Sequence, residues 1–457
     1  MPIAGIFGKL ATLGAGWVSR KSRKACNHTT NPKKYLVYLN KPHPLCNKTT
    51  FPMVSTKKYS VMKCLHLLLS LTLIAFVLAS CNKTAGGASG GSYSTTPGTL
   101  SSGGGGSSNS TGDTVHHTAG VLTAGEWNDH DNWDFWLALM GNDTFAAAQK
   151  AWGFACTARW NFTVRDANGN PVADAVVNIK NSDSIYWVCR TNKFGTARFL
   201  PVFSAEKPFA NLTWQVHYNG TDYTSGNLSL ATTDVPVTLP VAAVEKNAVD
   251  IMLVVDATGS MGDEMEYLKN ELYNVLDRTE QQLGYDKLHY GAVFYRDRNS
   301  GDAYITKPYD FTASKGDLVS FVKQQSADGG GDYPEAVDEA LEAALQQHWS
   351  TDAKARILFL VLDAPPHNAQ SNLDLLHSSI QKAAEKGIMI IPITASGVDK
   401  PTEFLMRFMA LATNGTYTFL TNDSGVGDNH ITPTVGKYTV EYLNNLMVRL
   451  ITKYAGR

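Results

Sequence analysis

The stretch VDIMLVVDATGS, residues 249–260, indicates the fold of the C-terminal half of the chain. Its first eight residues are almost continuously apolar and end on an acid, a pattern typical of a strand buried on both faces of a parallel sheet. Residues 356–363 (RILFLVLD) repeat this pattern, and residues 388–394 (IMIIPIT) predict a third buried strand.

Apolar residues at helical spacing lie between these strands. One helical face is formed by Met265, Leu268, Leu272, Val275 and Leu276. Further helices are expected at 336–347, 373–385 and 440–454. The alternation of strands and helices predicts a doubly wound, Rossmann-like α/β domain over residues 247–457, and the ligands of such sheets bind at the carboxyl ends of the strands.

Oxygen-bearing side chains stand where these strands end. Asp256, Thr258 and Ser260 alternate on one turn, Asp363 ends the second strand, and Asp332 follows a run of three glycines. Hard oxygen ligands of this kind suit Mg²⁺ or Ca²⁺. The sequence therefore predicts a metal site formed by these five residues.

The segments DATGSM, YRD, GGGDYPEA and DAPPH follow one another in this order between residues 256 and 367. Together they resemble the von Willebrand factor type A (VWA) domain with its metal-ion-dependent adhesion site, in a branch seen in some bacterial proteins and beside certain eukaryotic α-kinases. The resemblance covers 247–457. It implies that a divalent cation, Mg²⁺ first with Ca²⁺ or Mn²⁺ as alternatives, is held by Asp256, Thr258, Ser260, Asp332 and Asp363.

Asp332 stands where the better-known members of that family place a threonine. A third carboxylate would neutralise more of the ion's charge, so we expect a weaker pull on an acidic group of a partner. Other residues of these motifs receive structural interpretations. Arg296 and Asp297 are expected to pair or to orient the metal loop, and Glu335 to suit a helix N-terminus. His367 is expected to cap or pack its loop, with reach to the metal as the alternative. A domain that has lost its ion is the alternative for the whole site.

Residues 158–245 indicate a small all-β sandwich before the α/β domain. Apolar and polar residues alternate from Trp160, and strands are expected at 175–179, 185–189, 197–200, 212–218 and 227–231. The segments VRDANGNPVADAVVNIK and TNKFGTARF resemble the carboxypeptidase regulatory-like, transthyretin-type domains, which implies an accessory module. Residues 119–157 hold four tryptophans, and we expect this segment to dock on a neighbouring domain, with a sugar-binding surface as the alternative.

The N-terminal residues differ sharply in charge from the rest of the chain. Residues 1–80 hold 12 Lys and Arg and no acid, which leaves 28 basic and 41 acidic residues in 81–457. Residues 62–80 have the basic start, apolar core and small residues of a signal peptide. The ending LASC resembles the bacterial lipobox, which implies lipidation of Cys81. Residues 81–118 are rich in Gly, Ser and Thr and predict a flexible tether. Residues 1–61 are interpreted as a spurious extension, with Met62 as the initiator.

Two cysteines remain after the predicted lipid site. In an exported chain, Cys156 and Cys189 are a plausible disulfide pair. Two separately buried thiols are the alternative.

These features favour a lipid-anchored bacterial envelope protein, placed at the outer membrane, that binds a protein or matrix ligand through its cation. Its contact with the membrane is expected through the lipid anchor alone. The alternatives are a scaffold subunit of an envelope complex with a mainly structural metal, and a glycan-binding surface protein. No catalytic motif is recognised, so we expect no enzyme. The acidity of residues 81–457 argues against nucleic acid as a ligand.

Overall fold

The computed structural model describes residues 122–154, 156–201, 211–284, 287–298, 301–424 and 430–456. The predicted extension (1–61), signal peptide (62–80), lipid site Cys81 and tether (81–118) lie outside the described residues. Within the described ranges, no helix combines the length and the apolar character needed to cross a membrane.

The C-terminal half is built on an eight-stranded mixed sheet with the strand order β11-β10-β9-β12-β13-β14-β1-β15. Its central strands β10, β9, β12, β13 and β14 run parallel, whereas β11 and β1 run antiparallel to their neighbours. The predicted buried strands correspond to β9, β12 and β13, and the predicted α/β fold class is confirmed. The strands are β11 (Thr306–Thr312), β10 (Leu288–Tyr295), β9 (Ala248–Asp256), β12 (Ala353–Leu362), β13 (Ile388–Thr394), β14 (Tyr417–Thr421), β1 (Thr123–Trp127) and β15 (Val440–Tyr442).

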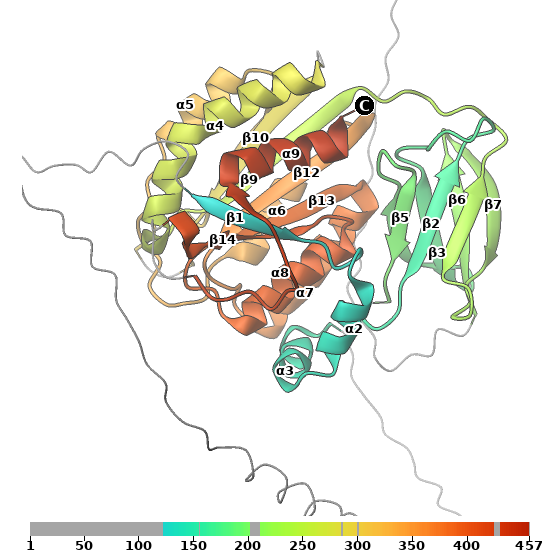
Figure 1. Cartoon of the computed structure of the whole chain (residues 1–457), viewed down its shortest axis with the longest axis horizontal. Helices are drawn as coiled ribbons and strands as arrows, with labels where there is room; N and C mark the ends of the chain where they lie inside the picture. Colours follow the sequence, from blue (N-terminus) through green and yellow to red (C-terminus); the bar gives the residue numbers. More distant parts are fainter. Residues whose placement is uncertain are drawn as a thin grey trace, which may run out of the picture. The chain divides into compact units, whose positions relative to one another are not determined.

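Helices cover both faces of this sheet (Figure 1). On one face, Ile251 and Leu253 of β9 share a core with α4, α5 and α9, and on the other, Met252 and Val254 share a core with α6, α7 and α8. This alternation explains why the strand is apolar at nearly every position. The helices are α4 (Gly262–Leu283), α5 (Lys315–Lys323), α6 (Val337–Leu345), α7 (Gln370–Lys386), α8 (Lys400–Ala412) and α9 (Leu443–Ala455).

The prediction of one helix over 440–454 was wrong at its start. Residues 440–442 form β15, which pairs with β1, and the helix begins at Leu443. Val440 and Tyr442 are exposed, so these residues gain backbone pairing rather than burial.

The tryptophan-rich segment contributes one strand to this sheet and two helices beside it. Its first residues form β1, which pairs with β14, and α2 (Trp133–Met140) and α3 (Asp143–Trp152) follow. The Trp136 ring stacks on Phe404 of α8 with centroids 5.6 Å apart. The indole of Trp152 donates to the carbonyl of Pro401 over 2.9 Å. The sheet of the α/β domain thus includes a strand that precedes the sandwich in the sequence as well as strands that follow it.

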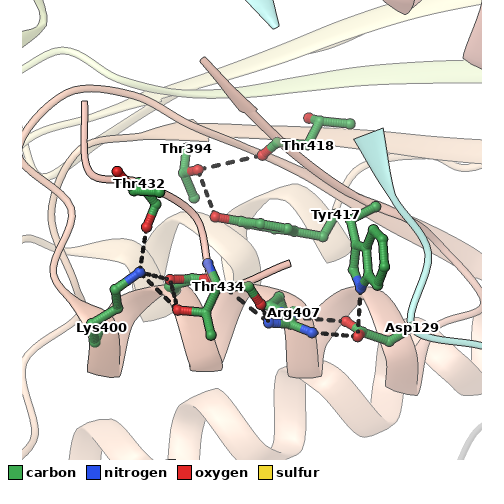
Figure 2. A network of polar contacts seen from close by, with 10 residues as sticks. Asp129, Thr394, Lys400, Arg407, Tyr417, Thr418, Thr432 and Thr434 are labelled. Carbon is green, nitrogen blue, oxygen red and sulfur yellow. Dashed lines mark hydrogen bonds and ion pairs between the residues drawn. The ribbon is translucent and has the colours of Figure 1, made fainter. Parts of the chain in front are cut away.

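A buried ionic network joins this segment to α8 (Figure 2). The fully buried Arg407 donates from Nε to Asp129 Oδ2 over 2.9 Å and also bonds the second oxygen of Asp129. Its Nη1 lies 3.6 Å from Glu403 Oε1. Glu403 also accepts from Lys400 Nζ over 2.7 Å and from the Thr434 backbone N–H over 2.6 Å. Charges of both signs therefore alternate through the network.

Residues 160–238 form two sheets with the strand orders β5-β2-β8 and β4-β3-β6-β7. The sheets face one another: Phe162 of one packs edge to face on Trp214 of the other with ring centroids 5.6 Å apart. The expected all-β sandwich is therefore present. Its strands are β2 (Trp160–Arg165), β3 (Val176–Asn181), β4 (Ser184–Arg190), β5 (Thr196–Phe199), β6 (Leu212–Tyr218), β7 (Thr221–Asn227) and β8 (Asp234–Thr238).

The strand predicted at 227–231 was wrong. Asn227 is the last residue of β7, residues 228–231 link β7 to β8, and Leu230 is 63% exposed. The strand that precedes them, β7, has the mostly polar sequence TDYTSGN and lies at the edge of its sheet, where apolar residues are not required.

The predicted disulfide is absent, and both cysteines are buried free thiols. Cys189 lies in β4 with its Sγ 4.0 Å from the Val177 carbonyl, inside the sandwich. Cys156 follows α3, and its carbonyl accepts from the Trp136 indole over 2.9 Å, beside α8. The two sulfurs thus lie beside different backbone carbonyls, those of Ala158 and Val177, and no bond joins them. Burial raises the pKa of Cys189 to about 12 and raises that of Cys156 as well, so both thiols stay protonated and unreactive.

Candidate metal centre

Three neighbouring strands bring acids to one edge of the sheet. Asp256 is the last residue of β9, Asp297 follows β10 by two residues, and Asp363 directly follows β12. These strands are adjacent and parallel, in the order β10-β9-β12. The chain moves from β9 to one side and later returns to the other, so the acids stand at a topological switch point, where open α/β sheets bind ligands.

The loop after β9 forms an oxygen-rich turn around Asp256. Asp256 Oδ1 accepts from the Thr258 backbone N–H over 2.9 Å and from its hydroxyl over 2.7 Å. The Thr258 and Ser260 hydroxyls are 3.3 Å apart, and the Ser260 hydroxyl bonds the Asp363 carboxylate. Asp256 and Thr258 are buried and Ser260 is exposed. The turn therefore joins the ends of β9 and β12 and has one face open to solvent.

The glycine-rich loop 329–331 passes closely over this turn. The Gly259 N–H donates to the Gly329 carbonyl over 3.2 Å. Gly330 has a φ of +87°, and a Cβ at this position would stand 3.3 Å from the Thr258 Cβ and 3.0 Å from Glu335 Oε1. A side chain would therefore force the loop away from Thr258, which explains the glycine here.

Glu335 is the acid that this loop carries into the interior. Its N–H donates to the Pro365 carbonyl over 2.8 Å, and the Ala336 N–H donates to the Arg296 carbonyl over 3.1 Å. These bonds fix the residue between the loops that follow β10 and β12. Glu335 is 4% exposed. The sequence indicated Glu335 as a favourable acid at a helix start and did not predict its burial. A glutamate suits both positions, so the sequence alone does not distinguish them.

Asp332 lies elsewhere in the same loop. It is exposed, and it gathers with Asp297 and His367, so that one ligand atom from each lies within 4.8 Å of the others. His367 Nε2 and Asp297 Oδ1 are 2.7 Å apart. The structure thus brings together Asp256, Thr258, Ser260 and Asp363 in one group and Asp332, Asp297 and His367 in another.

Burial and mutual repulsion raise the pKa values of these acids. The pKa of Asp256 rises to about 7 because of burial and the charge of Asp363. The pKa of Glu335 rises to about 9 because of burial and the charges of Asp256, Asp297, Asp363 and Asp302. Burial also raises the pKa of Asp363. Ionising all of these carboxylates without a cation nearby is therefore unfavourable.

Each of these three buried acids has an oxygen for which no hydrogen-bond partner is found among the described residues. These atoms are Asp256 Oδ2, Asp363 Oδ1 and Glu335 Oε2. Buried polar atoms are normally paired, and an unpaired set of anionic oxygens calls for a cation. Carboxylate and hydroxyl oxygens are the ligands of Mg²⁺ and Ca²⁺. The residues present fit a divalent cation, and Glu335 is a candidate ligand that the sequence did not predict.

A serine, a histidine and an acid also meet at the opposite end of the strands. His289 Nδ1 lies 2.9 Å from Asp250 Oδ1 and 3.2 Å from Ser350 Oγ. A catalytic triad needs the acid on one ring nitrogen and the serine on the other. Here both contact the same nitrogen, and the Ser350 hydroxyl donates to Asp250 over 2.8 Å. This arrangement is a structural hydrogen-bond cluster.

Comparison with known proteins finds partial relatives. The chain is 25% identical over 122 residues to the α-protein kinase vwkA of Dictyostelium discoideum, a match covering 27% of this chain and 19% of that protein. It is 31% identical over 126 residues to the ariadne-like RING finger protein R811 of Acanthamoeba polyphaga mimivirus, covering 28% of this chain and 12% of that protein. The chain thus spans less than a fifth of the length of either relative.

Similar solved structures come from Bacteroides. The protein BatB of Bacteroides thetaiotaomicron is 15% identical with a TM-score of 0.31, and the match covers 46% of this chain and 99% of that one. An aerotolerance-related membrane protein of Bacteroides fragilis is 12% identical with a TM-score of 0.29, covering 45% of this chain and 100% of that one.

The family model for the von Willebrand factor type A domain matches residues 250–428. The matched range begins in β9 and includes β12, β13 and every acid of the candidate centre. The C-terminal half of the chain therefore contains a von Willebrand factor type A domain.

Proposed function

We propose that the protein is an exported binding protein whose VWA domain holds a divalent cation and uses it to contact a protein or matrix ligand. The observation that carries this proposal is the set of unpartnered oxygens on the buried acids Asp256, Asp363 and Glu335. A protein that leaves such groups unpaired in its interior loses stability unless a cation binds there. The proposed role is binding, with no catalytic step.

In this proposal the cation is held by Asp256, Thr258, Ser260, Asp363 and Glu335. Mg²⁺ is the first candidate because the donors are all oxygens, with Ca²⁺ and Mn²⁺ as alternatives. The sequence suggested Asp332 as the fifth ligand; because Asp332 is exposed and grouped with His367, we propose the buried Glu335 as the fifth ligand. The number of carboxylates stays at three.

The open side of the centre is the side toward a partner. Ser260 and Asp332 are exposed, and Tyr333, the residue after Asp332, is 43% exposed. An ion below them would present one coordination position outward. Three carboxylates neutralise a divalent charge from within, so a neutral donor from the partner, such as a carbonyl or hydroxyl oxygen, suits this position better than a carboxylate.

A scaffold function with a mainly structural ion is the second candidate. The burial of the ligands favours this scaffold function, since Asp256 is completely buried and Glu335 nearly so. The two candidates differ in what metal removal does: an adhesive contact is abolished, whereas a docking contact is only weakened.

Glycan binding through the tryptophan-rich segment has less support. Trp127, Trp136 and Trp152 are buried against the α/β domain, with exposed fractions of 7%, 0% and 5%. Sugar binding by stacking needs an accessible ring face, and these three rings offer none; the fourth, Trp133, is partly exposed, but Arg159 lies over its ring, 4.6 Å from the centroid.

Attachment to the bacterial envelope through lipidated Cys81 is part of the proposal and is supported by the lipobox-like ending of residues 62–81. Labelling of cells with radioactive palmitate tests it directly. The wild type should incorporate label into the band of this protein, and Cys81→Ala should not. Label that persists in Cys81→Ala would remove the lipid anchor from the proposal.

The binding function is tested by capture from envelope extract with and without EDTA. We expect the wild type to retain a partner in Mg²⁺, to lose it in EDTA, and Asp256→Asn to lose it in both. Asp222→Asn is the matched control, because Asp222 is an exposed acid of the sandwich whose carboxylate contacts only His217 among the described residues. Capture that is equal in EDTA and for Asp256→Asn would contradict the adhesive function.

A further inference from the structure

The second group of ligand atoms at this edge has a different composition from the first. An imidazole nitrogen of His367 and carboxylate oxygens of Asp297 and Asp332 all lie within 4.8 Å of one another. Asp297 is completely buried, His367 is partly buried and Asp332 is exposed. They come from the loops after β10, after β12 and from the glycine-rich loop, so three separate segments converge here.

We propose that Asp297, Asp332 and His367 form a second cation site in this protein, distinct from the centre at Asp256. The site takes a first-row transition-metal ion, because one imidazole nitrogen with carboxylate oxygens suits Mn²⁺, Fe²⁺ or Zn²⁺ better than Mg²⁺ or Ca²⁺. The all-oxygen centre at Asp256 has the opposite preference. One edge of the sheet would then hold two ions of different chemistry.

Glu335 links this group of acids to the first one. It is 4% exposed, and its backbone neighbour Ala336 donates to the carbonyl of Arg296, the residue before Asp297. The charges that act on its carboxylate come from Asp297 and Asp302 as well as from Asp256 and Asp363. An ion bound to Asp297 would therefore reduce the repulsion between the two groups.

The backbone holds the three converging loops in place. The Glu335 N–H bonds the carbonyl of Pro365, two residues before His367, and the Ala336 N–H bonds the carbonyl of Arg296, one residue before Asp297. The loop that carries Asp332 is thus fastened to the loops that carry the other two ligands. Ligands fixed by such supporting bonds need little rearrangement when an ion binds.

The surroundings of His367 are also those of a metal-binding histidine. Its Nε2 lies 2.7 Å from Asp297 Oδ1, a contact that an ion can replace by binding both atoms. Asp338, on the helix that follows Glu335, is completely buried, and its Oδ1 has no hydrogen-bond partner.

Calorimetric titration of the purified, chelator-treated full chain with Mn²⁺ tests the proposal. We expect two Mn²⁺ ions per chain for the wild type. His367→Asn and Asp332→Asn should each bind one, and Asp256→Asn should lose the other. Because Asp332 is exposed, Asp332→Asn tests the site even where His367→Asn disturbs folding, and circular dichroism checks both variants.

His217→Asn is the matched control, because His217 also pairs with an acid, Asp222, over 2.8 Å but belongs to no group of three metal-ligating residues among the described ranges. It should keep both ions. A wild type that binds a single Mn²⁺, lost in Asp256→Asn alone, would overturn the second site and leave the proposed function intact. Two ions retained in Asp332→Asn and His367→Asn would also overturn it. Loss of binding in Asp256→Asn is a separate result that concerns the first centre only.

Discussion

Two buried groups of charged residues in the same domain are built in opposite ways. Around α8, Arg407 is enclosed by Asp129 and Glu403, and Lys400 and Thr434 complete the hydrogen bonds of Glu403 (Figure 2). At the carboxyl ends of β9 and β12, the buried acids Asp256, Asp363 and Glu335 form no ion pair with any of the described residues, and each has one oxygen without a hydrogen-bond partner.

The pKa values express the same difference. Although burial lowers it, the charge of Asp129 and its hydrogen bond raise the pKa of Arg407 above its usual value, so the network favours its charged form. The pKa of Glu335 rises to about 9 through burial and neighbouring acids, so its environment opposes its charge. A complete network joins segments of the fold, whereas an incomplete one marks a place for a ligand.

The largest expected effect is that of breaking the complete network. Arg407→Met leaves Asp129 and Glu403 as buried acids without their common partner, which should cost about 3–5 kcal/mol of the free energy of unfolding. Urea unfolding followed by tryptophan fluorescence measures this cost. The double variant Arg407→Met, Asp129→Asn should recover part of it, because one uncompensated charge is removed. A loss below about 1 kcal/mol for Arg407→Met would contradict a structural role for the network.

In the group of buried acids at the carboxyl ends of β9 and β12, removing a charge should have the opposite effect on stability. Without metal, Asp256→Asn should be at least as stable as the wild type, because it removes one of several repelling acids. With Mg²⁺ at a hundredfold excess over its dissociation constant, the wild type should gain about 2.7 kcal/mol and Asp256→Asn should gain nothing. Thermal unfolding in EDTA and in Mg²⁺ checks both statements. Strong destabilisation of Asp256→Asn in EDTA would show that the acid is needed without an ion.

The pH dependence of the metal-free protein gives a smaller and independent test. The pKa values of Asp256 and Glu335 are raised to about 7 and about 9, so between pH 5 and 9 the folded state retains protons that the unfolded state has released. Stability should therefore fall as pH rises, by about 2 kcal/mol between about pH 6 and 7. Urea unfolding in EDTA at these two pH values measures the change. The double variant Asp256→Asn, Glu335→Gln should flatten the profile, and an equal slope in that variant would assign the effect to other groups.

The buried strands of the α/β domain were predictable because their signal is local. β9 and β13 are buried at every position, so the apolar runs in the sequence identify them without knowledge of their neighbours. β1 gives no such signal, because it is short and its central residue is Gly125, where a Cβ would stand 2.7 Å from the Phe419 ring. Its place in the sheet depends on β14, which lies far along the chain.

The residues of the candidate centre likewise divide into those that a local pattern predicts and those that depend on tertiary packing. Asp256, Thr258 and Ser260 share one turn, so their spacing alone indicates a common site. The burial of Glu335 and the meeting of Asp297, Asp332 and His367 depend on the packing of three loops, which no local pattern records. These residues do lie within the sequence motifs, but the same residue types also suit a helix start, an ion pair or a loop cap.

The smallest expected effect comes from the rim of the complete network. Lys400 bonds Glu403 over 2.7 Å and the Thr432 carbonyl over 2.6 Å, but its side chain is 35% exposed. Lys400→Met should cost about 0.5–1 kcal/mol in urea unfolding, because Glu403 keeps its bond from the Thr434 N–H and its pairing with Arg407. A cost near that of Arg407→Met would mean that the network fails as a whole when any cation is removed. A small cost instead confines the structural demand to the buried arginine. This is the contrast with the edge of β9, where, among the described residues, no ion pair is formed with Asp256, Asp363 or Glu335.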